Sequence, residues 1–384
     1  MPIPNPIPFQ LTKEPIYDHC FSGDRKFVAI TKQNTAEIYD LSNNKPKLVT
    51  VLEGHDKTIT AIDIAPDGKI VTCSQDRNAI VWNKISGTGA SATYKSTLVL
   101  LRINRAATVA RWSPNGLKFA VGSSDRIIAV CYFEPENDWW VSKHIKKPLK
   151  STILSLDWHE NNVLLSCGSA DGHVRVFSGF IKSVDEKPLP TVWGDRLPFQ
   201  TLCGDYFLNG SWIHDVKFST NGEFLAFVSH DSSINILYPS KNGQEISIPD
   251  KFYQVKTSFL PFKSLIFINN SKIITAGNDC YPVVFEGNEN SGWNFTTSID
   301  DPIAKKQPTK VITNEDDEEL NQRDALNMFR QMDLKGSSSQ EHSGLLPTIH
   351  QNSITKIRPY SYNGQNVAKI STSGNDGKIV IFDV

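Results

Sequence analysis

The residues of this chain whose types and spacing could support chemistry are His55, Thr72, Asp76 and Trp82. A histidine paired with a carboxylate could act as a catalytic dyad, in which the carboxylate orients the imidazole for proton transfer. The same four residue types could instead form a buried structural network that joins the imidazole, the hydroxyl, the carboxylate and the indole N–H. We favour the structural network, because these residues belong to a unit that repeats along the chain.

A second set of the same residue types, His350, Thr372 and Asp376, occurs near the end of the chain. Phe382 stands where the tryptophan stands in the first set, and a phenyl ring cannot donate a hydrogen bond. We therefore expect the second network to be held less rigidly than the first, because it lacks this hydrogen-bond donor.

The short motifs of common active sites are missing from the sequence. It contains no G-x-x-x-x-G-K-[ST], no G-x-G-x-x-G after a strand, no H-E-x-x-H and no G-x-S-x-G. Its six cysteines include no C-x-x-C pair, so we expect neither a disulfide framework nor a zinc site, which favours a reducing compartment. We expect no catalytic residue, no cofactor and no metal. An active site built from several repeats in a central channel is the alternative.

The elements that would position these residues recur along the chain. The clearest copy, residues 54–83, combines an alternating apolar strand, a Pro-Asp-Gly turn, Asp76, and a strand that ends on Trp82. Weaker copies align on the same Asp-centred turn and closing aromatic, and with the first they give the closing residues Tyr39, Trp82, Phe133, Phe177, Tyr238, Phe285 and Phe382. A four-stranded blade needs roughly 40–45 residues and cannot bury both faces alone. Seven copies therefore predict an all-β, seven-bladed WD-repeat β-propeller, with residues 1–384 as one domain.

Closure of the ring predicts a role for the N-terminal segment. The chain ends soon after Phe382, so a segment around Phe9 to Thr12 should supply the outer strand of the last blade. Prolines precede this segment at positions 2, 4, 6 and 8, and an edge strand tolerates proline.

Composition narrows the function classes. The chain is 39% hydrophobic and 21% charged with a formal net charge of −1, which is ordinary for a soluble globular protein. A protein that mainly grips a phosphate backbone carries a positive excess, so we expect no nucleic-acid partner. The N-terminus has no charged start followed by an apolar stretch, and no run approaches eighteen apolar residues. We expect a cytoplasmic protein without membrane insertion.

A basic cluster at residues 143–147 follows Trp139 and Trp140. Aromatic stacking beside lysines is one form of nucleic-acid site. We favour an inter-blade loop in which the tryptophans pack against the ring and the lysines face water, with some contribution to a partner surface. The candidate partner surface comprises Arg102, Arg105, Trp139, Trp140, Lys146 and Lys147.

The repeat is interrupted between Asp279 and Asp376, which lie 97 positions apart. The excess length predicts an insert, residues 286–348, between blades 6 and 7. Within it we predict a helix over about 314–335, because Thr313 or Asn314 can cap it, acidic residues follow in the first turns, and Lys335-Gly336 ends it. One face of this helix would carry Leu320, Ala325, Met328, Phe329 and Met332.

Two hypotheses compete for this apolar face. The helix could dock on its own propeller, or the segment could be disordered, since an acidic run is usually solvated. Alternatively the helix projects and places Phe329 and Met332 in a groove of a partner. Polar tracts on both sides, residues 286–307 and 336–343, provide slack that favours the second hypothesis.

Several longer strings carry a resemblance to a known family. They are residues 97–107 (TLVLLRINRAA), 131–134 (CYFE), 136–141 (ENDWWV), 143–148 (KHIKKP), 155–159 (SLDWH) and 228–232 (VSHDS). Together they closely resemble subunit 1, the WD-repeat subunit, of the actin-related protein 2/3 complex. The likeness covers nearly the whole chain.

The resemblance implies a non-catalytic scaffold subunit of a seven-protein assembly that nucleates branched actin filaments under the control of nucleation-promoting factors. The implied partners are actin-related proteins, the other subunits, the actin filament and those factors, at actin-rich cytoskeletal structures. It also implies that the insert helix contacts actin or an actin-related subunit, with residues 329–333 resembling the core of that helix; the acidic run and the Ser-rich tail match less well. The main alternative is a propeller adaptor of another class, such as a ubiquitin-ligase substrate receptor or a trafficking scaffold.

Overall fold

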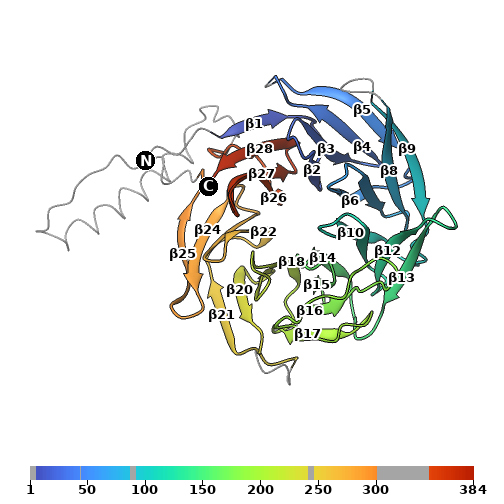
Figure 1. Ribbon diagram of the computed structural model, residues 1–384. Helices are drawn as coiled ribbons and strands as arrows, with labels where there is room; N and C mark the ends of the chain where they lie inside the picture. The colour runs from blue at the N-terminus through green and yellow to red at the C-terminus, as the bar shows by residue number, and fades with distance from the viewer. Residues whose placement is uncertain (1–5, 44, 87–91, 241–245, 301–345) are drawn as a thin grey trace, which may run out of the picture.

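The computed structural model describes residues 6–43, 45–86, 92–240, 246–300 and 346–384. These residues form seven four-stranded antiparallel sheets arranged around a central axis (Figure 1). The prediction of an all-β, seven-bladed propeller is confirmed. Nothing helical in the described part of the chain combines the length and the apolar character that a bilayer-spanning helix requires.

Within each of the first six blades the strands follow chain order from the hub to the rim. Blade 1 contains β2 (His19–Phe21), β3 (Phe27–Lys32), β4 (Thr35–Asp40) and β5 (Lys47–Glu53). Blade 2 contains β6 (Ile59–Ile64), β7 (Ile70–Ser74), β8 (Ala79–Ser86) and β9 (Thr93–Val99). Blade 3 contains β10 (Ala107–Trp112), β11 (Lys118–Ser123), β12 (Ile128–Glu134) and β13 (Trp139–Ile145).

The remaining blades repeat this arrangement. Blade 4 contains β14 (Ile153–Trp158), β15 (Leu164–Ser169), β16 (His173–Ser178) and β17 (Leu202–Phe207). Blade 5 contains β18 (Ile213–Phe218), β19 (Leu225–Ser229), β20 (Ser233–Tyr238) and β21 (Lys251–Lys256). Blade 6 contains β22 (Phe262–Asn269), β23 (Lys272–Gly277), β24 (Val283–Asn288) and β25 (Gly292–Ser298). Blade 7 contains β26 (Ile354–Asn363), β27 (Asn366–Gly374), β28 (Lys378–Asp383) and, from the other end of the chain, β1 (Ile7–Gln10).

The hydrophobic core lies between neighbouring blades. At one interface, Val71 and Val81 of blade 2 pack with Phe119 and Val121 of blade 3. The described residues contain one such cluster for each of the seven interfaces, including the interface between blades 7 and 1. Each blade therefore buries both faces only because the ring is closed.

Six of the seven innermost strands, all except β2, have a bulge near their first residue. In β6, for example, the pairing with β7 shifts between Ile59 and Ala61, and β10, β14, β18, β22 and β26 show the same irregularity at the corresponding place. A bulge increases the local twist and redirects the side chains that follow it. In these six strands the bulge therefore affects which way the side chains near the strand end point.

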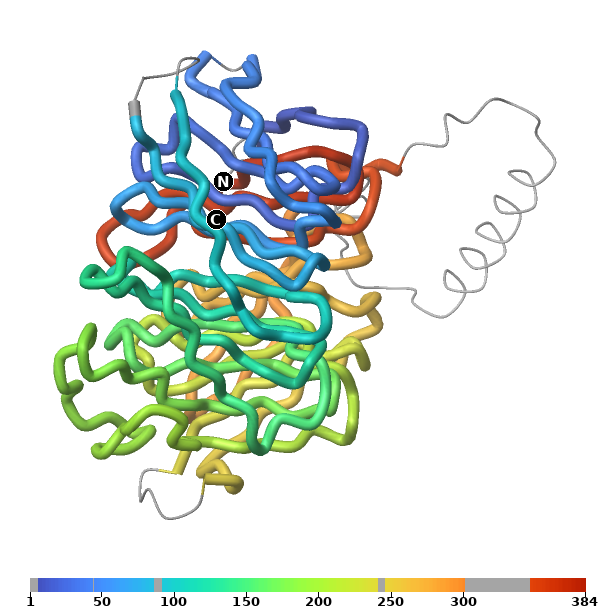
Figure 2. The backbone as a smooth tube through the Cα atoms, turned by 90° about the vertical axis from the view of Figure 1, so that its right-hand side faces the viewer, coloured from blue at the N-terminus to red at the C-terminus, as the bar shows by residue number. Residues whose placement is uncertain are grey.

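The first and last segments of the chain close the ring. Strand β1 pairs antiparallel with β28, with Phe9 opposite Ile379, so β1 is the outer strand of blade 7, as predicted (Figure 1). Pro8 lies on this edge strand, where its missing N–H removes no ladder bond from the interior. The side view shows the blue N-terminal and red C-terminal segments next to each other (Figure 2).

The predicted start of the insert at residue 286 is wrong. Residues 286–288 complete β24, and β25 follows as the outer strand of blade 6. The Asn-, Gly- and Ser-rich stretch that we interpreted as flexible is the hairpin turn, in which Asn288 accepts backbone hydrogen bonds from Asn290 and Ser291. The predicted helix at 314–335 lies outside the described residues.

Phe9→Ala should lower the free energy of unfolding by about 3–5 kcal/mol, because the phenyl ring is only 5% exposed at the interface of blades 7 and 1. Denaturant or thermal unfolding of the purified chain measures this effect. Ile7→Ala is the matched control, since Ile7 lies on the same strand but is 41% exposed. Equal stability of the two variants would contradict this account of ring closure.

Candidate functional site

His55, Thr72, Asp76 and Trp82 form a hydrogen-bonded structural network in blade 2. His55 Nδ1 lies 2.7 Å from Asp76 Oδ2, and His55 Nε2 lies 2.9 Å from Thr72 Oγ1. Trp82 Nε1 donates to the same Thr72 oxygen at 2.9 Å. With its proton on Nδ1, His55 donates to Asp76 and accepts from Thr72, so every member has a partner. Both ring nitrogens of this buried histidine are occupied, which leaves none for a substrate.

The second network, in blade 7, repeats the contacts of the histidine with the carboxylate and the threonine but lacks the aromatic donor. His350 Nδ1 lies 3.1 Å from Asp376 Oδ1, and His350 Nε2 lies 2.8 Å from Thr372 Oγ1. Burial opposes ionisation of Asp376, but the hydrogen bond and charge of His350 hold the pKa of the carboxyl below its usual value. Phe382 is buried and packs there without donating a hydrogen bond.

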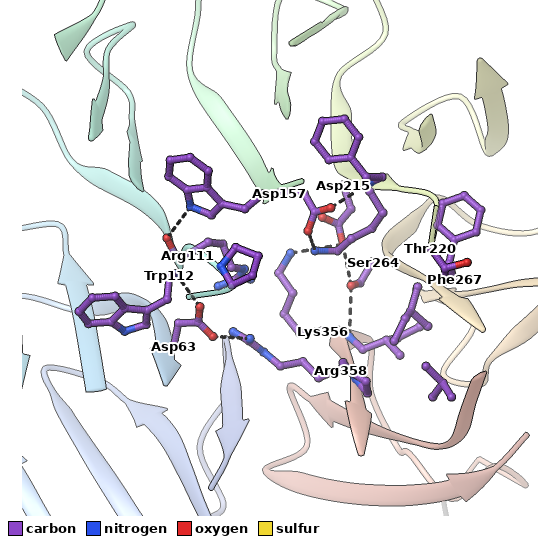
Figure 3. A pocket seen from close by; sticks show the side chains of 18 of the residues that line it. Asp63, Arg111, Trp112, Asp157, Asp215, Thr220, Ser264, Phe267, Lys356 and Arg358 are labelled. Atoms are coloured by element: carbon purple, nitrogen blue, oxygen red, sulfur yellow. Dashed lines mark hydrogen bonds and ion pairs between the residues drawn. The ribbon is translucent and has the colours of Figure 1, made fainter. Parts of the chain in front are cut away.

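A second group of polar side chains surrounds the hub. Asp63, Arg111, Asp157 and Lys217 each occupy the last position but one of the innermost strand, in blades 2, 3, 4 and 5 respectively. Their charges thus alternate in sign from one blade to the next. Figure 3 shows Asp63, Arg111 and Asp157 facing the same cavity, together with Arg358 of β26.

Side chains of the hub join consecutive blades, and at four of the interfaces the acceptor is a carboxylate. Asp63 Oδ2 accepts the backbone N–H of Trp112 in blade 3 at 2.8 Å. Asp157 Oδ2 accepts that of Phe218 in blade 5 at 2.9 Å. The same kind of bond joins Asp18 to Ile62, Asp215 to Leu265 and Ser264 to Ile357, while the indole of Trp158 donates to the carbonyl oxygen of Arg111.

Arg358 completes this circle. Its Nη1 donates to Asp63 Oδ1 at 2.7 Å, and its Nη2 donates to Asp18 Oδ1 at 3.0 Å, so blade 7 is tied to blades 1 and 2. Burial opposes ionisation of Asp18, but Arg111 and Arg358 outweigh it and hold the pKa of Asp18 far below its usual value. Each charge in this group is matched by an opposite one, and no three His, Cys, Asp or Glu side chains in the described residues gather as a metal site would require.

The candidate partner surface lies on the rim of blades 2 and 3, but not in a loop as we predicted. Trp139 and Trp140 begin β13, the outer strand of blade 3, because they pair with Glu134 and Phe133 of β12. Strand alternation turns Trp140 inward, against Trp112 and Phe119, and leaves Trp139 57% exposed.

Of the six predicted residues, the structure brings three together. Arg102, Trp139 and Trp140 line one rim pocket, and the Arg102 guanidinium donates to the backbone oxygen of Ser142. Arg105, Lys146 and Lys147 are exposed but line neither of the two pockets on this rim.

The rim also contains apolar residues that sequence reasoning missed. Leu98, Leu100 and Leu117 are 55%, 62% and 52% exposed, and Phe133 is 37% exposed. They line the two pockets beside Trp140. Phe133 is not the closing residue of blade 3, contrary to our prediction. The buried Cys131, which pairs with Phe119, holds that position instead. A group of exposed apolar side chains that lines adjoining pockets is typical of a protein contact.

The hub residues were also missed. The available signal was a charged residue before the last position of an apolar strand, repeated in four copies, but their partners lie far away in the sequence. The insert residues Leu320, Ala325, Met328, Phe329 and Met332 lie outside the described residues.

Comparison with known proteins gives consistent matches. A family model described as "WD domain, G-beta repeat" matches residues 46–83 and 141–178. "Actin-related protein 2/3 complex subunit 1" of Schizosaccharomyces pombe is 48% identical over 375 residues, covering 96% of this chain and 97% of the relative. The protein of the same name from Saccharomyces cerevisiae is 44% identical over 98% of this chain and 96% of its own length. "Actin-related protein 2/3 complex subunit 1A-B" of Xenopus laevis is 44% identical, with 97% and 95% covered.

Trp82→Ala should lower the free energy of unfolding by about 3–5 kcal/mol, since it removes a buried indole and the donor to Thr72. Trp139→Ala, at an exposed position, should stay within about 0.5 kcal/mol of the parent chain. Chemical denaturation of both variants measures the difference. An unchanged unfolding midpoint for Trp82→Ala would refute the role assigned to the blade 2 network.

Proposed function

Because the chain belongs to the family of actin-related protein 2/3 complex subunit 1, we propose that it is a non-catalytic scaffold subunit of the complex that nucleates branched actin filaments. The observation that carries this proposal is identity of 44–48% over 96–98% of the chain to relatives of that name. Its location would be cytoplasmic, at actin-rich parts of the cytoskeleton.

A scaffold role suits the physical character of the ring. The residues that resembled a catalytic dyad are engaged in a fold-stabilising network, and the hub charges are paired across blades. Such a body holds attached proteins at fixed relative positions, because its blades are joined to each other at the hub and by buried apolar clusters. Nucleotide chemistry would belong to the actin-related partners.

The rim of blades 2 and 3 is the proposed surface for a neighbouring subunit. Leu98, Leu100 and Trp139 offer exposed apolar area, and Arg102 adds a cation at its edge. Arg105, Lys146 and Lys147 lie exposed nearby along the chain and would supply the polar surroundings of the contact. Apolar anchors within a polar margin are the usual anatomy of a protein interface.

The insert is the proposed contact with actin or with an actin-related subunit, and it would respond to activation by nucleation-promoting factors. The argument is its sequence, in which Leu320, Ala325, Met328, Phe329 and Met332 fall at helical spacing. A contact favoured in the filament-bound state would shift the assembly toward that state.

Affinity purification of the tagged full-length chain tests the assembly. We expect actin-related proteins in equal stoichiometry with the chain, whereas recovery of a ligase or a vesicle coat instead would overturn the proposal. Trp139→Ala should recover less of the neighbouring subunits if the rim is an interface. Trp212→Ala is the matched control, because Trp212 is similarly exposed, at 54%, but precedes blade 5.

Replacement of both Phe329 and Met332 by Ala should leave folding and assembly intact but weaken nucleation, because it removes two large apolar side chains from the predicted helix face. A pyrene-actin polymerisation assay over a range of activator concentrations, with filament co-sedimentation, measures the loss. The control replaces Arg323 and Asn327 by Ala, because helical spacing would place these two residues opposite Phe329 and Met332. Nucleation equal to that of the parent at every activator concentration would argue against a role for the insert.

A further inference from the structure

The hub contains an ammonium group without a hydrogen-bond partner. Lys356 lies on β26 of blade 7, and its Nζ is 3.6 Å from Asp215 Oδ2, beyond hydrogen-bond distance. No other acceptor in the described part of the chain reaches this nitrogen. The side chain is only 16% exposed, so three N–H donors face the cavity with little bulk water around them.

Two further cations face the same cavity with donors to spare. Lys217 Nζ has one acceptor among the described residues, Asp157 Oδ1 at 2.7 Å, which leaves two of its three N–H groups without a protein partner. Arg111 uses Nη1 for Asp18 and for the carbonyl oxygen of Ala110, while its Nε and Nη2 find no acceptor in the described ranges.

The acceptors of the hub, in contrast, are already engaged. Asp157 accepts from Lys217 and from the backbone N–H of Phe218. Asp215 accepts from Ser264 and the backbone N–H groups of Leu265 and Val216. The formal charges of the hub balance, but Lys356, Lys217 and Arg111 each keep N–H groups without an acceptor among the described residues. The site therefore fits a compact ligand that is rich in acceptors.

The cavity is large enough for such a ligand. Its volume is about 460 Å³, which falls within the roughly 300–1,000 Å³ of typical small-molecule sites. Figure 3 shows Lys356 extending into this cavity toward Asp157 and Asp215, with Arg111 facing it. Burial lowers the pKa of Lys356, attraction to Asp215 and Asp18 opposes this shift, and repulsion from Arg111 and Lys217 adds to it, so the three cations are close enough to affect one another.

We propose that the hub binds a small free oxyanion of the phosphate class, held between Arg111, Lys217 and Lys356. A tetrahedral oxyanion offers acceptors in several directions, and lysine and arginine are the side chains that best bind phosphate. The three cations come from blades 3, 5 and 7, so the ligand bridges blades that do not touch each other. Because the oxyanion would bind the folded ring and not the unfolded chain, it would stabilise the folded state by mass action.

The test measures binding of inorganic phosphate and of pyrophosphate to the purified full-length chain. Phosphorus NMR titration and thermal unfolding are followed at constant ionic strength, with chloride as the compensating anion. We expect saturable binding of one anion per chain and a rise in Tm that saturates over the same concentration range. Absence of saturable binding of both anions would overturn the proposal.

Variants locate the site. Lys356→Gln should weaken binding by about tenfold or more, the usual effect of losing one charge-assisted hydrogen bond. Lys356→Arg, which keeps the charge, should retain binding within a few-fold. Arg105→Gln removes an exposed rim cation outside the hub and should leave the affinity unchanged.

Folding of each variant is checked by near-ultraviolet circular dichroism. If Lys356→Gln does not fold, Lys217→Gln replaces it, with the same expected loss. Affinity that is unaffected by the hub substitution, or that falls equally in Arg105→Gln, would show that phosphate binds elsewhere and would overturn the assignment.

Discussion

Closure of the ring is the constraint on which the rest of the molecule depends. Seven apolar clusters lie between blades, so an open array would expose one face of blade 1 and one of blade 7. Pairing of β1 with β28 closes the rim, and Arg358 closes the hub. The planar guanidinium reaches carboxylates of two blades and the carbonyl oxygen of Ile62 at once, which a single ammonium group could not do with the same geometry.

The hub charges determine blade geometry more than they add net stability. Burying a charged pair costs desolvation that its attraction only partly repays. Each hub carboxylate, however, also accepts a backbone N–H of the following blade, as Asp63 does from Trp112. Because a hydrogen bond of this kind requires a particular position of the next strand, the circle of such bonds fixes how consecutive blades are placed. Burial raises the pKa of Asp157 despite its pair with Lys217, whereas at Asp18 the two arginines outweigh burial and lower the pKa.

The sequence was sufficient for the number of blades and for the polar network of blade 2. The seven blades and the network of His55, Thr72, Asp76 and Trp82 could be predicted, because their signals are local turns, alternation and residue types at short spacing. The ion pairs of the hub could not be predicted, since Asp18 and Arg358 are separated by 340 positions. The outer strands of blades 3 and 6 were mistaken for loops, because exposed edge strands carry polar, Asn-rich or charged residues that also suit turns.

The two tryptophans of β13 link the fold to the proposed assembly. Trp140 is held between Trp112, Phe119 and Phe133, in the core between blades 2 and 3. Trp139 is the next residue on the same strand, and its indole N–H is fixed by a hydrogen bond of 2.9 Å to Glu134. An exposed anchor whose neighbour is locked in the core loses little conformational freedom when a partner covers it. A rim built in this way favours tight, geometrically defined attachment, which is what a subunit that positions other proteins requires.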